Sequence, residues 1–474
     1  MIFDGLTAQK GNGVLQLLSG HKHGRRELLS IGTLGLCGLA LPDLLRAQSA
    51  NDGVLKNKSV VFLNFQGGPT QFELFDPKPS APAEIRSIFG ATPTTIPGVQ
   101  FGSQLPLLAK HAHRMAVVRS YRHGISSHGP AAYHVMAGGN PSGAMMGALY
   151  ARAAGLSNPE TGMPRNALVT AAGVGEDFKG LYASVDRVSQ VGTLSAAYKP
   201  FNLGGGSTLI ENMKLQLAPE RLGDRKGLLG SLDKLKRQVD TARELQGQDR
   251  FQEQAFNVLT RGVSKAFDLS REDPAVLAAY DTEEMAPTPG AKARNSYAAQ
   301  FSPIALGRQL LMARRLIQSG CGFVTVTCGG WDMHGGGKEF TMRDGLNTLT
   351  PAVDKAVSAF IEDINQRGMA DDVLLVMTGE FGRTPRINKN GGRDHWGNLC
   401  PLVFVGGGLK MGQVIGQSDP HGGEPISDRV SSQQVLATIM NTLFDTGKLR
   451  LQQGIPREVA TTMTGGDPIP QLFS

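Results

Sequence analysis

Residues 323–334 read FVTVTCGGWDMH, and residues 373–385 read VLLVMTGEFGRTP. Each stretch begins as an apolar run of strand length and then breaks into a loop that contains Gly together with acidic or histidine residues. Residues 392–396, GRDHW, follow soon afterwards and add another acid and another histidine. Because ligands lie beyond the carboxyl ends of the strands in an open α/β sheet, we expect the functional site at these two strand ends.

After the first 48 residues, the chain alternates strand-like and helix-like segments. Residues 59–65 and 115–119 are two further apolar runs, and each leads into a loop rich in small, polar or histidine residues. Apolar residues at helical spacing predict a helix over 306–317, which Gly320 would end. A capping-box pattern at Ser431 predicts the start of a late helix. This alternation predicts an α/β fold.

Residues 205–300 have a different character. Apolar residues recur at helical spacing over 228–239 and again over 256–267, among many charged and amide side chains. We therefore expect a helical insertion that covers one edge of the sheet.

Composition places the protein among ordinary globular chains. Its 474 residues can form one large domain or two, with ample material for a buried core. The net charge of +7 is spread along the chain, and no long basic run is interleaved with aromatic residues. We therefore do not expect a nucleic-acid partner.

The first 48 residues have the features of an export signal. A basic segment at 21–26 precedes an apolar segment at 28–45, which is too short and too interrupted to form a stable membrane span. Arg25 and Arg26 resemble the pair that the twin-arginine translocase reads, which predicts a periplasmic or extracellular protein. The alternative is a basic surface turn before a core helix.

Few cysteines remain after such a signal is removed. Cys321, Cys328 and Cys400 lie in or beside apolar runs, and their number is odd. The sequence therefore predicts buried thiols rather than a disulfide framework.

Candidate metal ligands collect in the loops after the two strands quoted above. Asp332 and His334 stand two residues apart, so an extended segment would project both side chains to the same side. Taken alone, an acid in such a loop more often caps a turn. Three further acidic or histidine residues change that balance, namely Glu380, Asp394 and His395. Carboxylates and imidazoles without a thiolate indicate a divalent metal ion of hydrolytic chemistry, Zn, Mn, Mg or Ca.

Basic residues crowd the second of these loops. Arg383, Arg386, Lys389 and Arg393 fall between the candidate ligands. They could form a positive site for an anionic ester, in which Arg383 contacts the substrate, or they could form an ordinary solvated face.

Histidines and hydroxyls form a second group, after the strand at 115–119. Ser127 and His128 are neighbours, and a hydroxyl beside a histidine can indicate an activated nucleophile. We therefore treat both as catalytic candidates. The same residues also make an ordinary helix N-terminus, which for the serine alone is the favoured interpretation.

Several motifs together resemble a known family. They are GGPT at 67–70, FDPKP at 75–79, WDMH at 331–334, GEFGRTP at 379–385 and GRDHW at 392–396. They look like those of a large, poorly characterised family of exported bacterial proteins, described as sulfatase-like and placed in the alkaline phosphatase superfamily. The resemblance covers 58–447 and leaves 448–474 as a C-terminal extension. It implies a three-layer sandwich in which helices flank a mostly parallel or mixed sheet, with metal ligands at strand ends.

The chain also departs from the pattern of that superfamily. Where relatives have a metal-binding Asp after the first strand, this chain has Gln66, and where they have the second polar residue of Asp-His-Gly it has Phe381. Glu73 could replace an acidic ligand, whereas Gln71 could not act as a base. Gly138-x-x-Pro141 resembles the Thr-Gly-x-x-Pro that follows the nucleophile in sulfatases and phosphodiesterases. Counting back from it, the position of the nucleophile falls on His128. No Cys-x-Pro-x-Arg is present, so a formylglycine mechanism is not expected.

The sequence therefore favours an exported, metal-dependent hydrolase of phosphate or sulfate esters. Its substrate would be an anionic small molecule or a polysaccharide ester. The alternative is a binding or assembly protein on a hydrolase scaffold that has lost its chemistry, because the usual nucleophile is missing.

Overall fold

The computed structural model describes residues 53–204, 263–287, 289, 299–336 and 340–473. The predicted signal region and residues 205–262 of the predicted insertion lie outside these ranges. Within the described ranges, no helix has both the length and the apolar character needed to cross a membrane.

Twelve strands and nine α-helices form the described part of the chain. The strands are β1 (Ser59–Phe65), β2 (Ala91–Pro93), β3 (Gln100–Gly102), β4 (Met115–Val118), β5 (Asn166–Val169), β6 (Phe201–Asn202), β7 (Phe323–Cys328), β8 (Val373–Gly379), β9 (Gly382–Arg383), β10 (His395–Trp396), β11 (Leu402–Gly406) and β12 (Gln413–Ile415). The helices are α3 (Pro106–Lys110), α4 (His128–Ala137), α5 (Met146–Ala154), α9 (Pro274–Tyr280), α11 (Leu306–Gln318), α12 (Met342–Gln366), α13 (Ser432–Leu443), α14 (Thr446–Leu451) and α15 (Arg457–Thr464).

The central sheet has the strand order β12-β4-β11-β8-β1-β7-β5-β6. Strand β11 runs antiparallel to both of its neighbours, and the other neighbouring pairs are parallel. Strands β1, β7 and β8 are almost continuously apolar because both faces of a largely parallel sheet are covered. The four strands expected from apolar runs are therefore confirmed.

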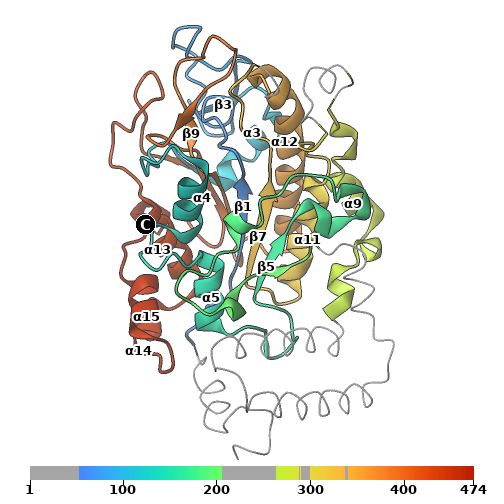
Figure 1. Cartoon of the computed structure of the whole chain (residues 1–474), viewed down its shortest axis with the longest axis vertical. Coiled ribbons are helices and arrows are strands. Elements are labelled where there is room, and N and C mark those ends of the chain that lie inside the picture. The colour runs from blue at the N-terminus through green and yellow to red at the C-terminus, as the bar shows by residue number, and fades with distance from the viewer. Residues whose placement is uncertain (1–52, 205–262, 288, 290–298, 337–339, 474) are drawn as a thin grey trace, which may run out of the picture.

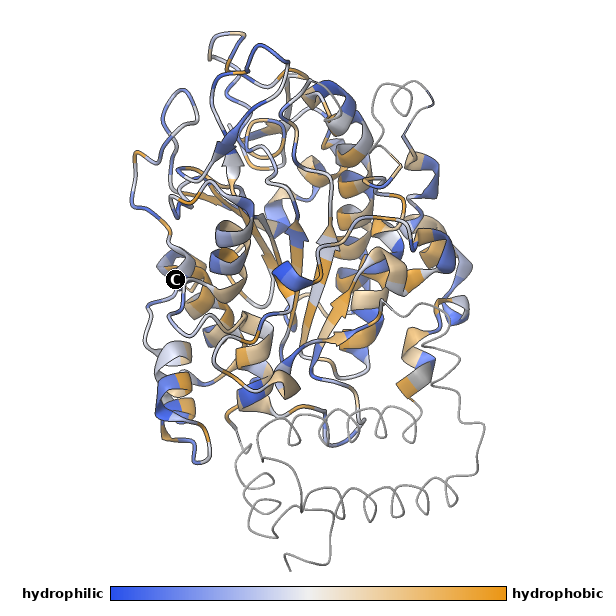
Figure 2. Ribbon diagram, viewed as in Figure 1, coloured by the Kyte–Doolittle hydropathy of each residue, from blue (hydrophilic) through white to orange (hydrophobic). Residues whose placement is uncertain are grey.

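Helices cover both faces of this sheet (Figure 1). Helices α4, α5 and α13 pack on one face, whereas α3, α11 and α12 pack on the other. Alternate residues of β1 supply the two cores: Val61 and Leu63 face α11 and α12, and Val60 and Phe62 face α5 and α13. Figure 2 shows the same division, with apolar residues on the sheet and on the inner helix faces. The predicted α/β sandwich is confirmed.

Two expected helices form as their sequences indicate. Helix α11 ends at Gln318, and Gly320 follows with φ +98°. Helix α13 begins after Ser431, whose hydroxyl and the Gln434 side chain make the reciprocal bonds of a capping box. Both helices bury their apolar faces against the sheet.

The described part of the insertion is fastened to α11 and α12 by buried charges. The guanidinium of Arg314 contacts Glu272 at 2.7 Å and Asp363 at 2.8 Å. The hydroxyl of Tyr280 donates to the same Asp363 carboxylate at 3.0 Å. Residues Val263–Phe267, the end of the second expected insertion helix, form a short 3-10 helix.

The C-terminal segment after residue 447 also joins the core. Helix α15 packs against α13, and Met463, Ile469 and Leu472 are buried in the core on that side of the sheet. This segment therefore contributes to the same globular body as the sheet.

Candidate metal and active site

Three neighbouring strands bring the candidate loops together. Strand β1 pairs in parallel with β7 on one side and β8 on the other, so Phe65, Cys328 and Gly379 end at one edge of the sheet. The loop after β7 lies directly on the loop after β1, where the backbone N–H of Trp331 donates to the backbone carbonyl of Gln66 at 3.1 Å. A Cβ at Gly67 (φ +111°) would lie 2.6 Å from the backbone nitrogen of Asp332, so this approach requires glycine.

The carboxylate of Asp332 is the centre of the site. Its Oδ1 atom lies 3.0 Å from Nε2 of His334 and 3.1 Å from Nε2 of His395. Its Oδ2 atom lies 3.2 Å from Nε2 of His128. Burial alone would raise the pKa of Asp332, but the hydrogen bonds from the three histidines outweigh burial and hold that pKa far below its usual value.

Each of these histidines is held in place through its other ring nitrogen. Nδ1 of His128 contacts Oε2 of Glu380 at 2.5 Å, and Nδ1 of His334 contacts Oδ1 of Asp394 at 2.8 Å. Nδ1 of His395 contacts the backbone carbonyl of Ser126 at 3.0 Å. A carbonyl oxygen or an ionised carboxylate can only accept, so Nδ1 of each ring carries a proton. The three Nε2 atoms are thereby left to face Asp332. Without an ion, Nε2 carries a second proton when it donates to Asp332, and with an ion bound Nε2 would be unprotonated.

This donor set fits a divalent metal ion. His334 and His395 also face each other, with 2.8 Å between their Nε2 atoms. Ligand atoms of His128, Asp332 and His395 all lie within 4.8 Å of one another. Imidazoles that present Nε2 to one carboxylate, while Nδ1 is bonded to an oxygen acceptor, are typical of metal-binding histidines. His128, Asp332, His334 and His395 are therefore the residues that would hold the ion.

Two of the residues expected as ligands lie one step further out. Glu380 and Asp394 reach the cluster, but their carboxylates contact the Nδ1 atoms of His128 and His334 rather than the centre. Conversely, His128, expected as a catalytic group, turns Nε2 toward the centre. Adjacent residues 394 and 395 both reach the cluster because the loop before them curls, with φ +75° at Gly391.

Electrostatics reinforce this arrangement. Burial would lower the pKa of His128, but the hydrogen bonds to Asp332 and Glu380 raise it to about 9. The hydrogen bond to Asp332 raises the pKa of His334, and the bond from His334 lowers the pKa of Asp394. In the absence of an ion, protons on the imidazoles would balance the carboxylates.

Ser127 does not form the nucleophile arrangement that its position beside His128 suggested. It is exposed and is the N-cap residue of α4, and both ring nitrogens of His128 are directed at carboxylates. The neighbouring Ser126 hydroxyl accepts the N–H of Gly397 at 2.8 Å. The helix N-terminus interpretation therefore describes Ser127.

Arg383 lies inside the protein rather than facing a substrate. Its side chain is 2% exposed, and its Nη2 atom donates to Oδ1 of Asp332 at 2.7 Å. The rest of the guanidinium donates to the backbone carbonyls of Gly67, Gly68, Trp331 and Arg393. Because these bonds join the loops after β1, β7 and β8, the side chain positions Asp332. The expected contact with a substrate anion does not fit this burial.

The other basic residues of the expected anion site are also dispersed. Arg393 is fully buried, donates to backbone carbonyls such as that of Ile85, and stacks on the ring of Phe72 at 4.1 Å. Arg386 is exposed and pairs with Glu84 at 3.5 Å. Lys389 is exposed on the same loop. These residues therefore do not converge on one anion.

The positions that depart from the superfamily pattern have structural roles. Phe381 packs beside His128 and His395, with ring centroids 5.2 Å and 4.3 Å away. The Gln71 amide donates to the carbonyl of Arg383 and accepts its N–H. Glu73 is buried and accepts from Ser87 and Ile88, so it does not take the place of an acidic ligand.

One site residue was missed by the sequence interpretation. Arg187, in the 3-10 helix η4 (Asp186–Val188), contacts Oε1 of Glu380 at 3.3 Å. It lies far along the chain from every motif described above. Because no periodicity or spacing connects it with the strand ends, only tertiary contact identifies it.

Comparison with known proteins gives the family of the chain. A family model described as "Protein of unknown function (DUF1501)" matches residues 57–469, most of the 474-residue chain. The chain belongs to this family. The expected membership of a poorly characterised family is therefore confirmed, and that description assigns no activity. No curated protein matches the sequence significantly.

This DUF1501 protein is similar to several solved structures at low identity. A phosphonate monoester hydrolase from Silicibacter pomeroyi has 12% identity and a TM-score of 0.37, with 87% of this chain and 78% of that chain covered. A sulfatase from Pseudoalteromonas sp. has 13% identity and a TM-score of 0.30, with 83% and 73% covered. An alkaline phosphatase mutant, TAB5 with Mg bound, has 9% identity and a TM-score of 0.30, with 76% and 95% covered.

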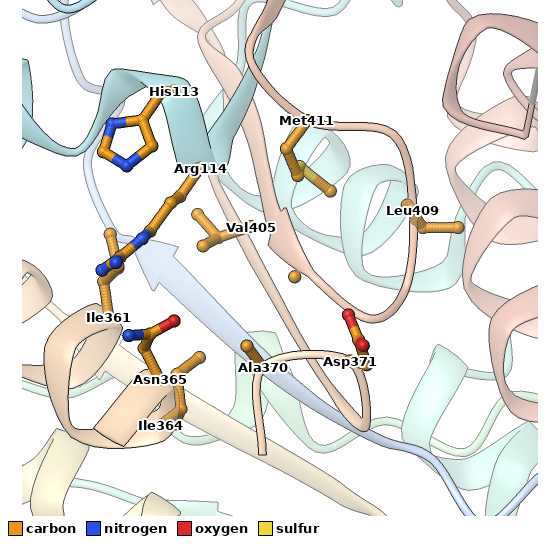
Figure 3. A pocket seen from close by; sticks show the side chains of 11 residues that line it. His113, Arg114, Ile361, Ile364, Asn365, Ala370, Asp371, Val405, Leu409 and Met411 are labelled. Atoms are coloured by element: carbon orange, nitrogen blue, oxygen red, sulfur yellow. The ribbon is translucent and has the colours of Figure 1, made fainter. Parts of the chain in front are cut away.

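A separate cavity of about 240 Å³ lies at the opposite end of the sheet (Figure 3). It is lined by residues that precede β4 and β8, such as Arg114 and Asp371, and by the end of β11. Arg114 is paired with Glu362 at 3.2 Å. Since its polar groups do not converge as those around Asp332 do, the strand-end cluster remains the candidate site of this DUF1501 protein.

The expected cysteine state is confirmed in the described residues. Cys321, Cys328 and Cys400 are free and buried. Burial raises the pKa of each thiol to about 12, so none is poised to react as a thiolate.

Proposed function

We propose that this DUF1501 protein is a metal-dependent hydrolase of phosphate or sulfate esters. The observation that supports the proposal most is the convergence of three Nε2 atoms on Asp332, each ring being fixed through Nδ1. Three imidazoles and one carboxylate favour an ion such as Zn or Mn, because Mg and Ca prefer all-oxygen sites. When bound, such an ion would withdraw electron density from the ester oxygens.

The chain's own residues define how an ester could be attacked. His128 is held between Asp332 and Glu380, and Ser127 is not bonded to an imidazole in this arrangement. We therefore propose that water, rather than a side chain, attacks the ester. The water oxygen forms a bond to phosphorus or sulfur while the bond from that atom to the ester oxygen breaks. One water proton ends on the leaving alkoxide to give the alcohol, and the other stays on the phosphate product or passes from the sulfate product to solvent. The contact between Asp332 and the buried Arg383 holds the loops after β1, β7 and β8 in fixed positions relative to one another for this reaction.

The lack of an imidazole partner for Ser127 among the described residues also supports a second candidate function. A protein that keeps the metal but has lost ester chemistry would bind an anion or a partner, as expected of a degenerate hydrolase scaffold. The two functions differ in turnover rather than in metal content. A panel of aryl phosphate, phosphate diester and aryl sulfate substrates, tested with Zn and Mn supplied, distinguishes them.

Elemental analysis of purified protein tests the metal site itself. We expect wild type to retain bound metal and Asp332→Ala to retain little. Asp371→Ala is a matched control, because Asp371 is an exposed carboxylate at the opposite end of the sheet. Equal, negligible metal in all three proteins after supplementation would reject the site, and metal-loaded wild type without turnover would favour the binding function.

We further propose that the protein is exported by the twin-arginine translocase and acts in the periplasm or outside the cell. The proposal rests on Arg25 and Arg26 before an apolar segment. This route carries folded proteins, so a metal could be bound before export. The substrate would then be an anionic small molecule or a polysaccharide ester outside the cytoplasm.

A further inference from the structure

Arg187 differs from the other arginines near the site because it is partly open to solvent. Its side chain is 30% exposed, whereas that of Arg383 is 2% exposed. One guanidinium nitrogen, Nη1, contacts Glu380 at 3.3 Å. Among the residues that the structure describes, no second hydrogen bond to this guanidinium is found. The group is thus anchored at one corner, and its remaining N–H donors are available.

The anchor places this positive charge beside the metal-binding cluster. Glu380 is completely buried, and its two oxygens are divided between His128 and Arg187. The same carboxylate therefore orients a metal-facing imidazole and a guanidinium. A tetrahedral oxyanion near His128 would lie within the reach of a planar fork that can bind two of its oxygens.

Gln66 holds the segment that delivers Arg187. Its amide donates from Nε2 to the carbonyl of Ser184 and accepts the N–H of Ser184 on Oε1, both at 3.0 Å. Gln66 is 1% exposed and lies directly after β1. A carboxylate could accept from Ser184 but could not donate, so the two-bond contact requires an amide. This contact explains why an amide rather than an acid is suited to this strand end.

We propose that Arg187 contacts the anionic group of the substrate and that Gln66 is its positioning residue. The word substrate rests on the proposed hydrolase function, but recognition of a phosphate or sulfate oxyanion does not require turnover. Arg187 would then supply the positive charge that the sequence assigns to the loop of Arg383. The side chains of Arg383 and Arg393 are used on backbone carbonyls, and that of Arg386 pairs with Glu84.

Calorimetric titration of the metal-loaded protein with inorganic phosphate and with inorganic sulfate tests this proposal. Arg187→Gln should weaken oxyanion binding by about 10- to 100-fold, the usual effect of losing a charge-assisted contact, and should leave metal content unchanged. Arg187→Lys should recover part of the affinity, because it restores the charge without the fork. Arg386→Gln is the matched control: it removes the same charge from an exposed arginine paired with Glu84 and should bind like wild type.

A double-mutant cycle tests the part assigned to Gln66. Gln66→Ala should weaken oxyanion binding in the wild-type background but add little in the Arg187→Gln background, because it acts through that arginine. Additive effects of the two changes would overturn the positioning role of Gln66. Melting curves and elemental analysis of each variant show whether fold and metal are retained.

The results separate this proposal from the hydrolase function. Oxyanion affinity that depends on Arg187, without ester turnover, would support the anion contact and remove the hydrolase. Equal oxyanion affinity in wild type and Arg187→Gln would overturn the contact, even if wild type turns over esters. Loss of metal in both Arg187→Gln and Arg187→Lys would also overturn it, because Arg187 would then only support Glu380 and His128. A metal-loaded wild type that binds neither oxyanion would overturn it as well.

Discussion

The Nε2 atoms of His334 and His395 face each other at 2.8 Å, although the residues lie 61 positions apart in the chain. Both rings are bonded through Nδ1 to an oxygen acceptor, Asp394 for one and the Ser126 carbonyl for the other. Two lone pairs would therefore oppose each other unless a proton or a cation lies between them. The two histidines would therefore hold an ion through Nε2, whereas the groups bonded to Nδ1 orient the rings.

The first prediction compares His334→Ala with Asp394→Asn. His334→Ala removes a donor atom and should abolish tight metal binding. Asp394→Asn keeps an oxygen that can accept from Nδ1, so metal should still bind at saturation, with affinity reduced about 10- to 100-fold. Titration against a competing chelator measures both. Identical loss in the two variants would show that Asp394 is itself a ligand.

The second prediction concerns the buried guanidinium of Arg383. Arg383→Ala would leave the carbonyls of Gly67, Gly68 and Trp331 without this donor and would remove one of the donors to the Asp332 carboxylate. We expect the free energy of unfolding to fall by about 3–5 kcal/mol and metal to be lost. Arg383→Lys should not rescue either property, because one ammonium group cannot replace the planar fork. Chemical denaturation and elemental analysis measure these effects; a stable, metal-replete Arg383→Ala with only a raised KM would restore the substrate-contact role.

The third prediction separates Ser127 from His128. Ser127→Ala should leave metal content and any ester turnover unchanged, since its side chain makes no capping bond and is exposed. His128→Ala should lower both together, because it removes a metal-facing imidazole. The two variants are assayed side by side by elemental analysis and initial rates. A silent His128→Ala, or an inactive Ser127→Ala with full metal, would contradict the assignment.

The fourth prediction is a pH dependence of stability that is independent of the metal site. Asp354 accepts the N–H groups of Leu107 and Leu108, and its burial raises its pKa to about 6. Because its pKa in the unfolded chain is about 3.9, the folded state binds more protons between these values. Its contribution to stability is therefore complete below about pH 4 and is lost as pH rises through 6.

The substitution Asp354→Asn tests that contribution. The difference in free energy of unfolding between wild type and Asp354→Asn should change by about 2–3 kcal/mol between pH 4 and pH 7, with the variant relatively more stable at pH 7. Urea denaturation at several pH values measures it. A difference that is constant across this range would mean that the pKa of Asp354 is not raised in the folded state.

The fifth prediction concerns export. Replacement of both Arg25 and Arg26 by Lys should leave precursor in the cytoplasm, because the translocase reads the guanidinium pair. Cell fractionation with immunodetection measures the distribution. The matched control is Arg86→Lys, a change of the same kind outside the export segment. Normal secretion of the double variant would remove the proposed route.

The layers of the fold follow from local patterns in the chain. Apolar runs of strand length, helical spacing in α11 and the capping box of α13 are properties of neighbouring residues, and each produced the expected element. Parallel strands end at the same edge of a sheet, so the sequence also predicted that the acidic and histidine residues of these loops lie together. They are Asp332, His334, Glu380, Asp394 and His395.

Those patterns could not predict which residues contact Asp332 directly and which contact only its histidine partners. Glu380 and Asp394 have carboxylates, which can bind a metal ion. In the folded protein these carboxylates instead contact the Nδ1 atoms of His128 and His334. Arg383 carries a charge that suits an anion, yet the meeting of three loops buries it among carbonyls. Arg187 contacts Glu380 across the fold, and Gln66 bonds to Ser184 in the same segment as Arg187. Residue type and spacing specify which groups can meet at a strand end, whereas long-range packing assigns which atom faces which, and no local period encodes that choice.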